Sequence, residues 1–203
     1  MYILELICII IISILLYNIY YHDVPYQEDM VQVKSTIDNN EYTVKDSVTK
    51  QEAADQLAKI RHKLLKLIKY LQTHYPEDER VHRVIKKFNY NNISEHFPSS
   101  NSNLTSYSIN KGDKMVFCLR QHDTNKSMVD ENTLMFVSLH ELAHVMTISV
   151  GHEKEFWDNF KFLLKNAIKT GLYQYHPYHI KTQRYCGTEI TDTPYHHDSY
   201  YYD

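Results

Sequence analysis

The feature that most constrains the fold is the stretch from Asp130 to Val150, which is apolar on almost every side of a helix. Asp130 is a suitable N-cap, because its carboxylate can accept hydrogen bonds from the free amides of the first turn. A helix without a polar face has to be enclosed by the rest of its domain. We therefore expect this stretch to form the central buried helix. Its apolar residues are Leu134, Met135, Phe136, Val137, Leu139, Leu142, Ala143, Val145, Met146, Ile148 and Val150.

Beyond its first turn, this stretch carries three ionisable side chains: His140, Glu141 and His144. A buried imidazole or carboxylate needs a partner. Residues four positions apart share one helical face, so both histidine rings can reach a single ion at about 2.0–2.1 Å. Glu141 points about 100° further around the helix, beside that ion and close to a water bound to it. The pattern predicts a Zn²⁺ site in which His140 and His144 are ligands and Glu141 is the general base for the zinc-bound water.

A catalytic zinc site takes a third protein ligand and keeps its fourth position open, whereas a structural site has four protein ligands. We expect His152 to be the third ligand, because Gly151 suits the C′ position of the ending helix and lets the chain turn back. The competing explanation is that two core histidines fell into this spacing by chance in a chain with 13 His. Carboxylate alternatives for the third ligand are Glu153, Glu155 and Asp158.

Three further amphipathic helices are expected around the central one, because apolar residues recur at helical intervals. Thr49 followed by Glu52 has the spacing of a capping box at the start of the first helix. The opposite face of that helix is basic, which is typical of a solvated surface. Gly171 suits the end of the last helix. The three helices are expected at 49–76, 77–88 and 153–169.

Strands are expected on both sides of the first helix. Ser106 to Ile109 and Lys114 to Arg120 flank a turn-like Asn-Lys-Gly-Asp and predict a β-hairpin directly before the central helix. Val31 to Val44 contains a second turn signal and predicts a short hairpin or a loose extended segment. The Asn- and Ser-rich run 89–105 is typical of a loop. The fold class is α+β, mostly helical, with a small hairpin or sheet before the central helix.

The N-terminal segment from Ile3 to Tyr21 is almost continuously apolar, and Glu5 is its one charged residue. A bilayer core needs about 20 mainly apolar residues, and tyrosines suit the headgroup level. A cleaved signal peptide would have a basic start and small residues before the cleavage site, and a core helix this apolar would need a larger domain around it. We expect a transmembrane helix. The side of the membrane cannot be read, because the first basic residue is Lys34.

Net charge and cysteine content narrow the possible classes of function and fold. The formal net charge of −3 provides no overall basic field for nucleic acid. Cys8, Cys118 and Cys186 are too few and too scattered for a disulfide framework, although a single bridge from Cys118 to Cys186 stays open.

The C-terminal region is rich in Tyr and His, and one of these side chains could stabilise an oxyanion. These residues are Tyr173, Tyr175, His176, Tyr178, His179, Tyr185, His196 and His197, and an aromatic tail wrapped over the domain is the competing explanation.

The sequence around the two helix histidines resembles a known family of enzymes. Leu139 to His144 reads LHELAH and is followed by Gly151-His152 and Phe156-Trp157. This run resembles the active-site run of the WLM and SprT-like zincin metallopeptidases over about Ser106 to Gly171. The interval of eight residues from His144 to His152 leaves the choice between the two families open. The layout of an anchor and a minimal zincin domain is also similar to metallopeptidases of large DNA viruses.

The resemblance implies that His140, His144 and His152 bind zinc and that Glu141 is the general base. It also implies that the strand Lys114 to Arg120 borders the cleft and pairs with an extended protein or peptide substrate. We expect residues 1–22 to be the transmembrane anchor, 23–48 a juxtamembrane linker and 49–203 the zinc metallopeptidase domain with its core at 106–171. The alternative is a non-catalytic, membrane-anchored domain with a structural zinc site. Proteolysis of DNA-bound proteins is disfavoured by the anchor and the acidic balance.

Overall fold

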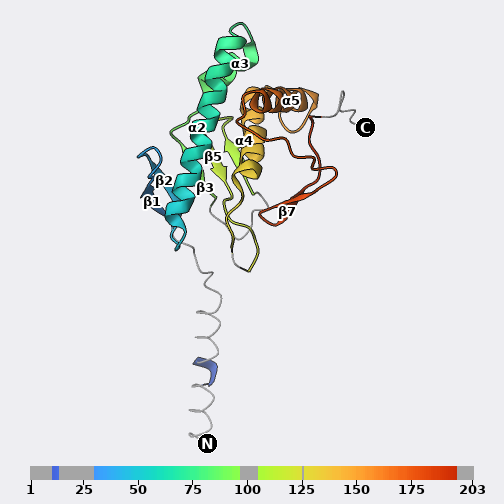
Figure 1. The fold of residues 1–203 in the computed structure, drawn as a ribbon. Coiled ribbons are helices and arrows are strands. Elements are labelled where there is room, and N and C mark those ends of the chain that lie inside the picture. Colours follow the sequence, from blue (N-terminus) through green and yellow to red (C-terminus); the bar gives the residue numbers. More distant parts are fainter. Residues whose placement is uncertain (1–10, 14–29, 97–104, 125, 196–203) are drawn as a thin grey trace, which may run out of the picture.

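The computed structural model describes residues 11–13, 30–96, 105–124 and 126–195 (Figure 1). Apart from residues 11–13, the predicted transmembrane helix lies outside these ranges. Within them, no helix has both the length and the apolar character needed to cross a membrane. The anchor therefore stays a prediction.

The centre of the fold is a mixed five-stranded sheet in the order β1-β2-β3-β5-β4. β2 and β3 are parallel, as are β3 and β5, while the two outer pairs are antiparallel hairpins. Both predicted hairpins are confirmed, and the first joins the same sheet through β2. The strands are β1 (Met30–Lys34), β2 (Glu41–Lys45), β3 (Ile93–Glu95), β4 (Tyr107–Ile109) and β5 (Lys114–Phe117), with a separate hairpin of β6 (Gln183–Tyr185) and β7 (Thr188–Ile190).

The prediction of loop throughout 89–105 was wrong at β3. All three residues of this strand are buried, so it shows none of the polar–apolar alternation that identifies a half-buried strand. It lies between two parallel neighbours in the middle of the sheet. The α+β class is confirmed, and the sheet is larger than the small hairpin that the sequence predicted.

In the part of the chain that the structure describes, four helices pack around the sheet: α2 (Lys50–His74), α3 (Glu79–Lys87), α4 (Glu131–Met146) and α5 (Lys154–Lys169). α2 contacts β1, β2 and β3, whereas α4 contacts β4 and β5, and the two helices also pack against each other (Figure 1). α5 packs on α4. Apart from Val137, at 9%, and the partly exposed His140 and His144, the residues of α4 from Thr133 to Met146 are at most 5% exposed, which confirms the central buried helix.

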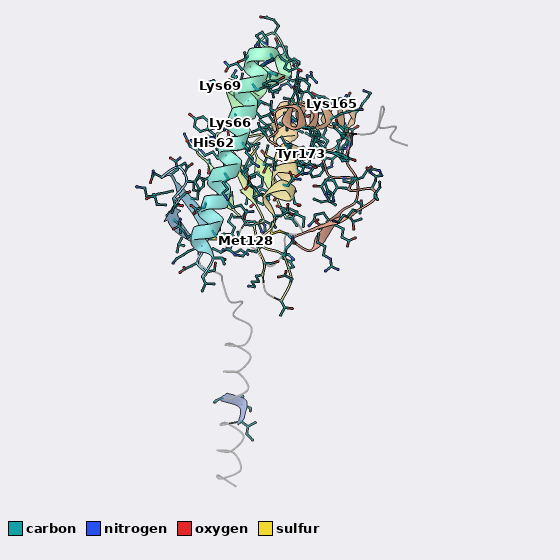
Figure 2. The ribbon with its side chains drawn as sticks, viewed as in Figure 1. His62, Lys66, Lys69, Met128, Lys165 and Tyr173 are labelled. Atoms are coloured by element: carbon teal, nitrogen blue, oxygen red, sulfur yellow. A yellow bond between two sulfur atoms is a disulfide. The ribbon has the colours of Figure 1, made fainter. Side chains whose placement is uncertain are left out.

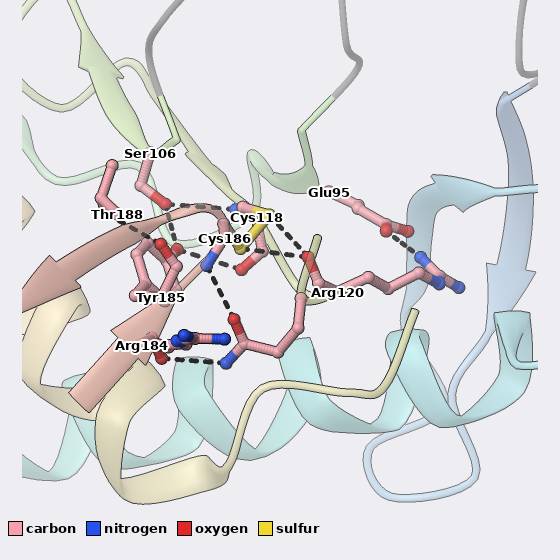
Figure 3. The surroundings of a disulfide bond; sticks show 9 residues. Glu95, Ser106, Cys118, Arg120, Arg184, Tyr185, Cys186 and Thr188 are labelled. Carbon is pink, nitrogen blue, oxygen red and sulfur yellow. Dashed lines mark hydrogen bonds and ion pairs between the residues drawn. A yellow bond between two sulfur atoms is a disulfide. The ribbon is translucent and has the colours of Figure 1, made fainter. Parts of the chain in front are cut away.

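The start of α2 was predicted correctly, but the capping box was wrong. The side chain of Thr49 makes no capping hydrogen bond. Its Oγ1 instead accepts hydrogen bonds from Arg120 Nε at 3.2 Å and Nη2 at 3.1 Å. Arg120 also forms a buried ion pair with Glu95 at the end of β3 (Figure 3). The threonine therefore helps to satisfy a buried guanidinium rather than the helix terminus.

The basic face of α2 agrees with its interpretation as a solvated surface. His62, Lys66 and Lys69 are exposed along one side of the helix (Figure 2). Lys63 reaches across to the Glu131 carboxylate at 2.6 Å, at the start of α4. This face therefore carries part of the contact between α2 and α4 and presents its remaining charges to solvent.

A disulfide joins Cys118, just after β5, to Cys186, just after β6, across 68 residues of sequence (Figure 3). Tyr185 strengthens this connection, because its hydroxyl donates to the Cys118 carbonyl at 3.0 Å and also contacts the Ser106 hydroxyl. The Cys186 amide donates to the Gln121 side chain at 2.9 Å. The bridge that the sequence left open thus holds the C-terminal hairpin against the main sheet.

Candidate metal centre

Three histidine side chains converge at the C-terminal half of α4. His140 and His144 project from one face of the helix, and His152 reaches them from the loop before α5. His140 Nε2 lies 3.3 Å from His144 Nε2 and 3.1 Å from His152 Nε2. Nitrogens about 2.0–2.1 Å from one tetrahedral ion would be separated by roughly 3.3 Å. The sequence-predicted ligand set therefore comes together with spacing that suits zinc.

Phe156 in the first turn of α5 packs against all three rings. Its centroid lies 4.8 Å from that of His140, 4.4 Å from that of His144 and 4.6 Å from that of His152. Phe156 is fully buried, so it provides a rigid apolar floor for the cluster. The sequence indicated Phe156 as an inward residue of a helix, but the periodicity could not show that it supports the ligands.

This apolar surround keeps the imidazoles neutral. Burial, together with positive charge on the neighbouring histidines, lowers the pKa of His140 to about 3. Burial, then His152 and Lys111, lower the pKa of His144 to about 4, and burial also lowers the pKa of His152. Neutral imidazole is the form that binds metal, so near neutral pH protons do not compete with an ion for these nitrogens.

Glu141 lies beside the cluster and is only 5% exposed. Burial raises the pKa of its carboxyl to about 7, and a hydrogen bond from the Ser108 amide acts in the opposite direction. A carboxylate with a pKa near the working pH can both accept and return a proton. The sequence predicted the base, whereas its contact with β4 depends on tertiary structure and had no local signal.

The loop that presents His152 is held by charged side chains from three separate elements. Lys111 Nζ donates to the carbonyls of Thr147, Ile148 and Ser149 at 2.9, 2.6 and 2.8 Å. Arg83 on α3 donates to the last carbonyl of α4. Glu155 Oε1 and Oε2 accept from the amides of the same loop at 2.9 and 3.0 Å. Nothing in the local sequence identifies Lys111 or Arg83 as supports of this loop.

These contacts correct two expectations. The central helix ends at Met146 and not at about Val150, because the amides of residues 148 and 149 bond to Glu155 and not to helix carbonyls. Gly151 has φ 84°, so it makes a left-handed turn before His152, but it lies beyond the C′ position of α4.

The three carboxylates that were alternatives for the third zinc ligand have other roles. Glu155 binds the loop, Asp158 pairs with Lys154 at 2.6 Å, and Glu153 is the N-cap of α5. Within the described ranges, the histidine cluster contains none of these carboxylates.

A cavity of about 310 Å³ opens over the histidines. One side is formed by the edge strand β4 with Tyr107 and Ser108, and the other by His152 and its loop. The prediction that the strand 114–120 borders the cleft was wrong. β5 is an inner strand, paired with β3 and β4, so among the described strands the sheet edge beside the cluster belongs to β4.

The C-terminal Tyr and His residues that could stabilise an oxyanion occupy different places in the structure. Tyr185 lines a second cavity with His140 and Glu141, but its hydroxyl already donates to the Cys118 carbonyl. Tyr173 and Tyr178 pack against Phe136 in the core. His196 and His197 lie outside the described residues. Tyr175 stacks near Tyr195, His176 Nε2 lies 2.8 Å from the Lys181 carbonyl, and neither these two nor His179 lines the cavity over the histidines.

Comparison with known proteins gives both a family match and viral relatives. A family model described as "WLM domain" matches residues 38–200. Uncharacterized protein R325 of Acanthamoeba polyphaga mimivirus is 32% identical over 163 residues, which are 79% of this chain and 82% of that protein. Uncharacterized protein 136R of Invertebrate iridescent virus 6 is 41% identical over 70 residues, 34% of this chain and 38% of that protein. Crystal structures of Wss1 from Saccharomyces cerevisiae and of a Wss1 mutant have TM-scores of 0.48 and 0.49 at 23% identity, covering 63% and 64% of this chain and 89% and 92% of theirs.

Proposed function

The chain belongs to the WLM domain family, and on this premise we propose that it is a zinc-dependent metallopeptidase that hydrolyses peptide bonds. The family match decides between the two resemblances in favour of WLM. The observation that carries the proposal is the convergence of His140, His144 and His152 beside the buried Glu141, in a cavity open to substrate. The three imidazoles would hold the ion, which leaves a position free on the side of the cavity.

When bound, zinc supplies Lewis acidity, which lowers the pKa of water and polarises a peptide carbonyl. Glu141 then acts as the general base: it accepts a proton as the water oxygen bonds to the carbonyl carbon. As the carbon–nitrogen bond breaks, Glu141 passes that proton to the leaving amine. The Ser108 amide holds the carboxylate in place between these two transfers.

The edge of β4 suits an extended protein or peptide substrate. A peptide that adds to a free strand edge gains backbone hydrogen bonds in register with that strand. β4 lies beside the histidines and lines their cavity through Tyr107 and Ser108, so an added strand would pass over the cluster. We expect main-chain hydrogen bonds to β4 to contribute to the affinity for substrates of many different sequences.

Replacement of Glu141 by Gln in the full chain tests the mechanism. The variant should keep its zinc and lose detectable cleavage of an unfolded protein substrate, because the amide cannot accept the proton. Glu153→Gln is the matched control. Glu153 lies at an exposed position two residues before Glu155, and its side chain makes no capping hydrogen bond. Unchanged cleavage by Glu141→Gln would contradict the assignment of the base.

The alternative function is a structural zinc site without catalysis. It requires a fourth protein ligand, whereas the metal-binding group in the described residues consists of three histidines. Zinc K-edge absorption spectroscopy of the full chain distinguishes the two. Three nitrogen ligands and one exchangeable oxygen support the peptidase, and four protein ligands support the structural site.

We also propose that residues 1–22 anchor the domain in a membrane, on the basis of the apolar composition of Ile3 to Tyr21. The full chain should then remain in the membrane fraction after alkaline carbonate extraction, and a chain starting at residue 23 should be released. Release of the full chain under the same conditions would contradict the anchor.

A further inference from the structure

A second cavity of about 350 Å³ borders the proposed site. His140 and Glu141 line both cavities, whereas His144 and His152 line only the first. The second cavity therefore borders the reacting centre at His140 and Glu141 without being lined by the other two histidines. We call it the side-chain pocket.

The walls of the side-chain pocket are mainly apolar. Phe136 and Val137 come from α4, Trp157 and Phe160 from α5, and Ile190 from the C-terminal hairpin. An apolar cavity of about 150 Å³ is enough to bind benzene in another protein. The side-chain pocket is larger than this, so it has room for an aromatic or a large aliphatic side chain, and the carboxylates of Glu141 and Asp192 in its lining disfavour an acidic one.

The side of the pocket formed by the C-terminal hairpin is fixed in place. Tyr185 lines the pocket, and the next residue, Cys186, is bridged to Cys118. The Tyr185 hydroxyl contacts Ser106 at the start of the edge-strand hairpin, and Ser106 also lines the pocket (Figure 3). A preformed apolar pocket loses little free energy in rearrangement when it binds.

We propose that the side-chain pocket binds a large apolar side chain of the substrate, on the amine side of the cleaved bond. The proposal rests on the peptidase function proposed above. Glu141 must reach the leaving amine to return its proton, so the residue that carries this amine lies next to Glu141. Glu141 lines the side-chain pocket, whereas His144 and His152 line only the cavity over the histidines, so we assign the pocket to the amine side and that cavity to the carbonyl side.

The first test is the cleavage profile of the full, zinc-loaded chain on a peptide library derived from a proteome. Residues such as Phe, Leu, Met or Trp should dominate the position just after the cut, with kcat/KM about tenfold to hundredfold above that for Ala. Val137→Phe fills the pocket from α4 and should shift the preference toward Ala and Gly. Ile190→Phe fills it from the opposite wall and should do the same without altering the buried helix. Val48→Phe is the matched control at a fully exposed site.

A profile without enrichment after the cut, or with the enrichment before it, would overturn the proposal. A wild-type cleavage profile in both filling variants would overturn it as well. These outcomes differ from failure of the peptidase function, in which the wild-type chain cleaves nothing.

The second test needs neither metal nor catalysis. Trp157 is the one tryptophan of the chain and lies in the pocket wall, so its fluorescence reports occupancy. The peptide acetyl-Ala-Ala-(4-bromophenylalanine)-Ala-Ala-amide should quench Trp157 in the zinc-free Glu141→Gln chain, because bromine quenches a nearby indole. Val137→Phe and Ile190→Phe in that background should reduce the quenching, and Val48→Phe should retain it. Equal quenching of Trp157 in chains with and without the pocket-filling substitutions would overturn the proposed role of the pocket, even if the enzyme is active.

Discussion

Glu155 is predicted to control zinc affinity although it is not a ligand. Its carboxylate accepts hydrogen bonds from the Ile148 and Ser149 amides at 2.9 and 3.0 Å, and from the Ser149 hydroxyl at 2.9 Å. Hydrogen bonds to buried charged groups contribute about 1.5–3 kcal/mol, but this side chain is 36% exposed. We therefore assign about 1 kcal/mol to each of the two backbone bonds, or about 2 kcal/mol in all.

Glu155→Ala removes these acceptors and frees the loop that carries His152. If the full 2 kcal/mol is lost from the positioning of that ligand, the Kd for zinc rises by about 30-fold. This lies within the roughly 10- to 100-fold range for outer partners of metal ligands. Glu155→Gln keeps one acceptor oxygen and should show a smaller rise.

Competition with a chromophoric zinc chelator measures these constants. Glu153→Ala is the control, since it removes an exposed carboxylate from the same helix terminus. If Glu155→Ala binds zinc as tightly as Glu153→Ala, the hydrogen bonds do not position His152. The cobalt-substituted proteins provide a second readout, because displacement of one nitrogen ligand changes the visible absorption of Co²⁺ while a general loss of stability does not.

Three further predictions concern stability, each measured by urea unfolding. Replacing Cys118 and Cys186 by Ser should cost about 4 kcal/mol, because the bridge closes a loop of 68 residues, and a loss below about 1 kcal/mol would contradict a formed bridge. The hydrogen bond from the Arg80 side chain holds the pKa of Asp78 below its usual 3.8, so its stabilising effect is present above that value and is lost as the pH falls through the lowered pKa. Asp78→Asn should therefore be destabilised at about pH 7, and its deficit should shrink as the pH falls below the usual 3.8; a deficit that stays constant down to complete protonation of the carboxyl would refute this linkage. Gly112→Ala should cost more than about 1 kcal/mol, because Gly112 has φ +118° and a Cβ would lie 2.7 Å from a carbonyl oxygen of α3; an unchanged midpoint would refute the close approach.

Much of the core was predictable because it depends on local periodicity. The apolar surround of α4, the Asp130 cap and the stop at Gly171 are properties of neighbouring residues, and the structure contains all three. Asp130 accepts from the Thr133 amide at 2.9 Å, and the Gly171 amide bonds to the Ile168 carbonyl at 3.0 Å. The spacing of His140 and His144 is fixed by the helix itself, so these two could be paired from sequence alone.

The features that were missed depend on residues distant in sequence. Thr49 would cap α2 if Arg120 did not reach it from beyond β5. α4 would continue past Met146 if Glu155 and Lys111 did not bond to the following loop. β3 is recognisable only from its two parallel neighbours. In each case a tertiary hydrogen bond or strand pairing outweighs the local preference.

The metal content of the purified full chain tests the central claim most directly. We predict one zinc per chain in the wild type and in Glu141→Gln, and loss of stoichiometric zinc when His140, His144 or His152 is replaced by Ala, measured by mass spectrometry of the metals in folded protein. Stoichiometric zinc that persists in all three histidine variants, or a wild-type chain that binds none, would contradict the account.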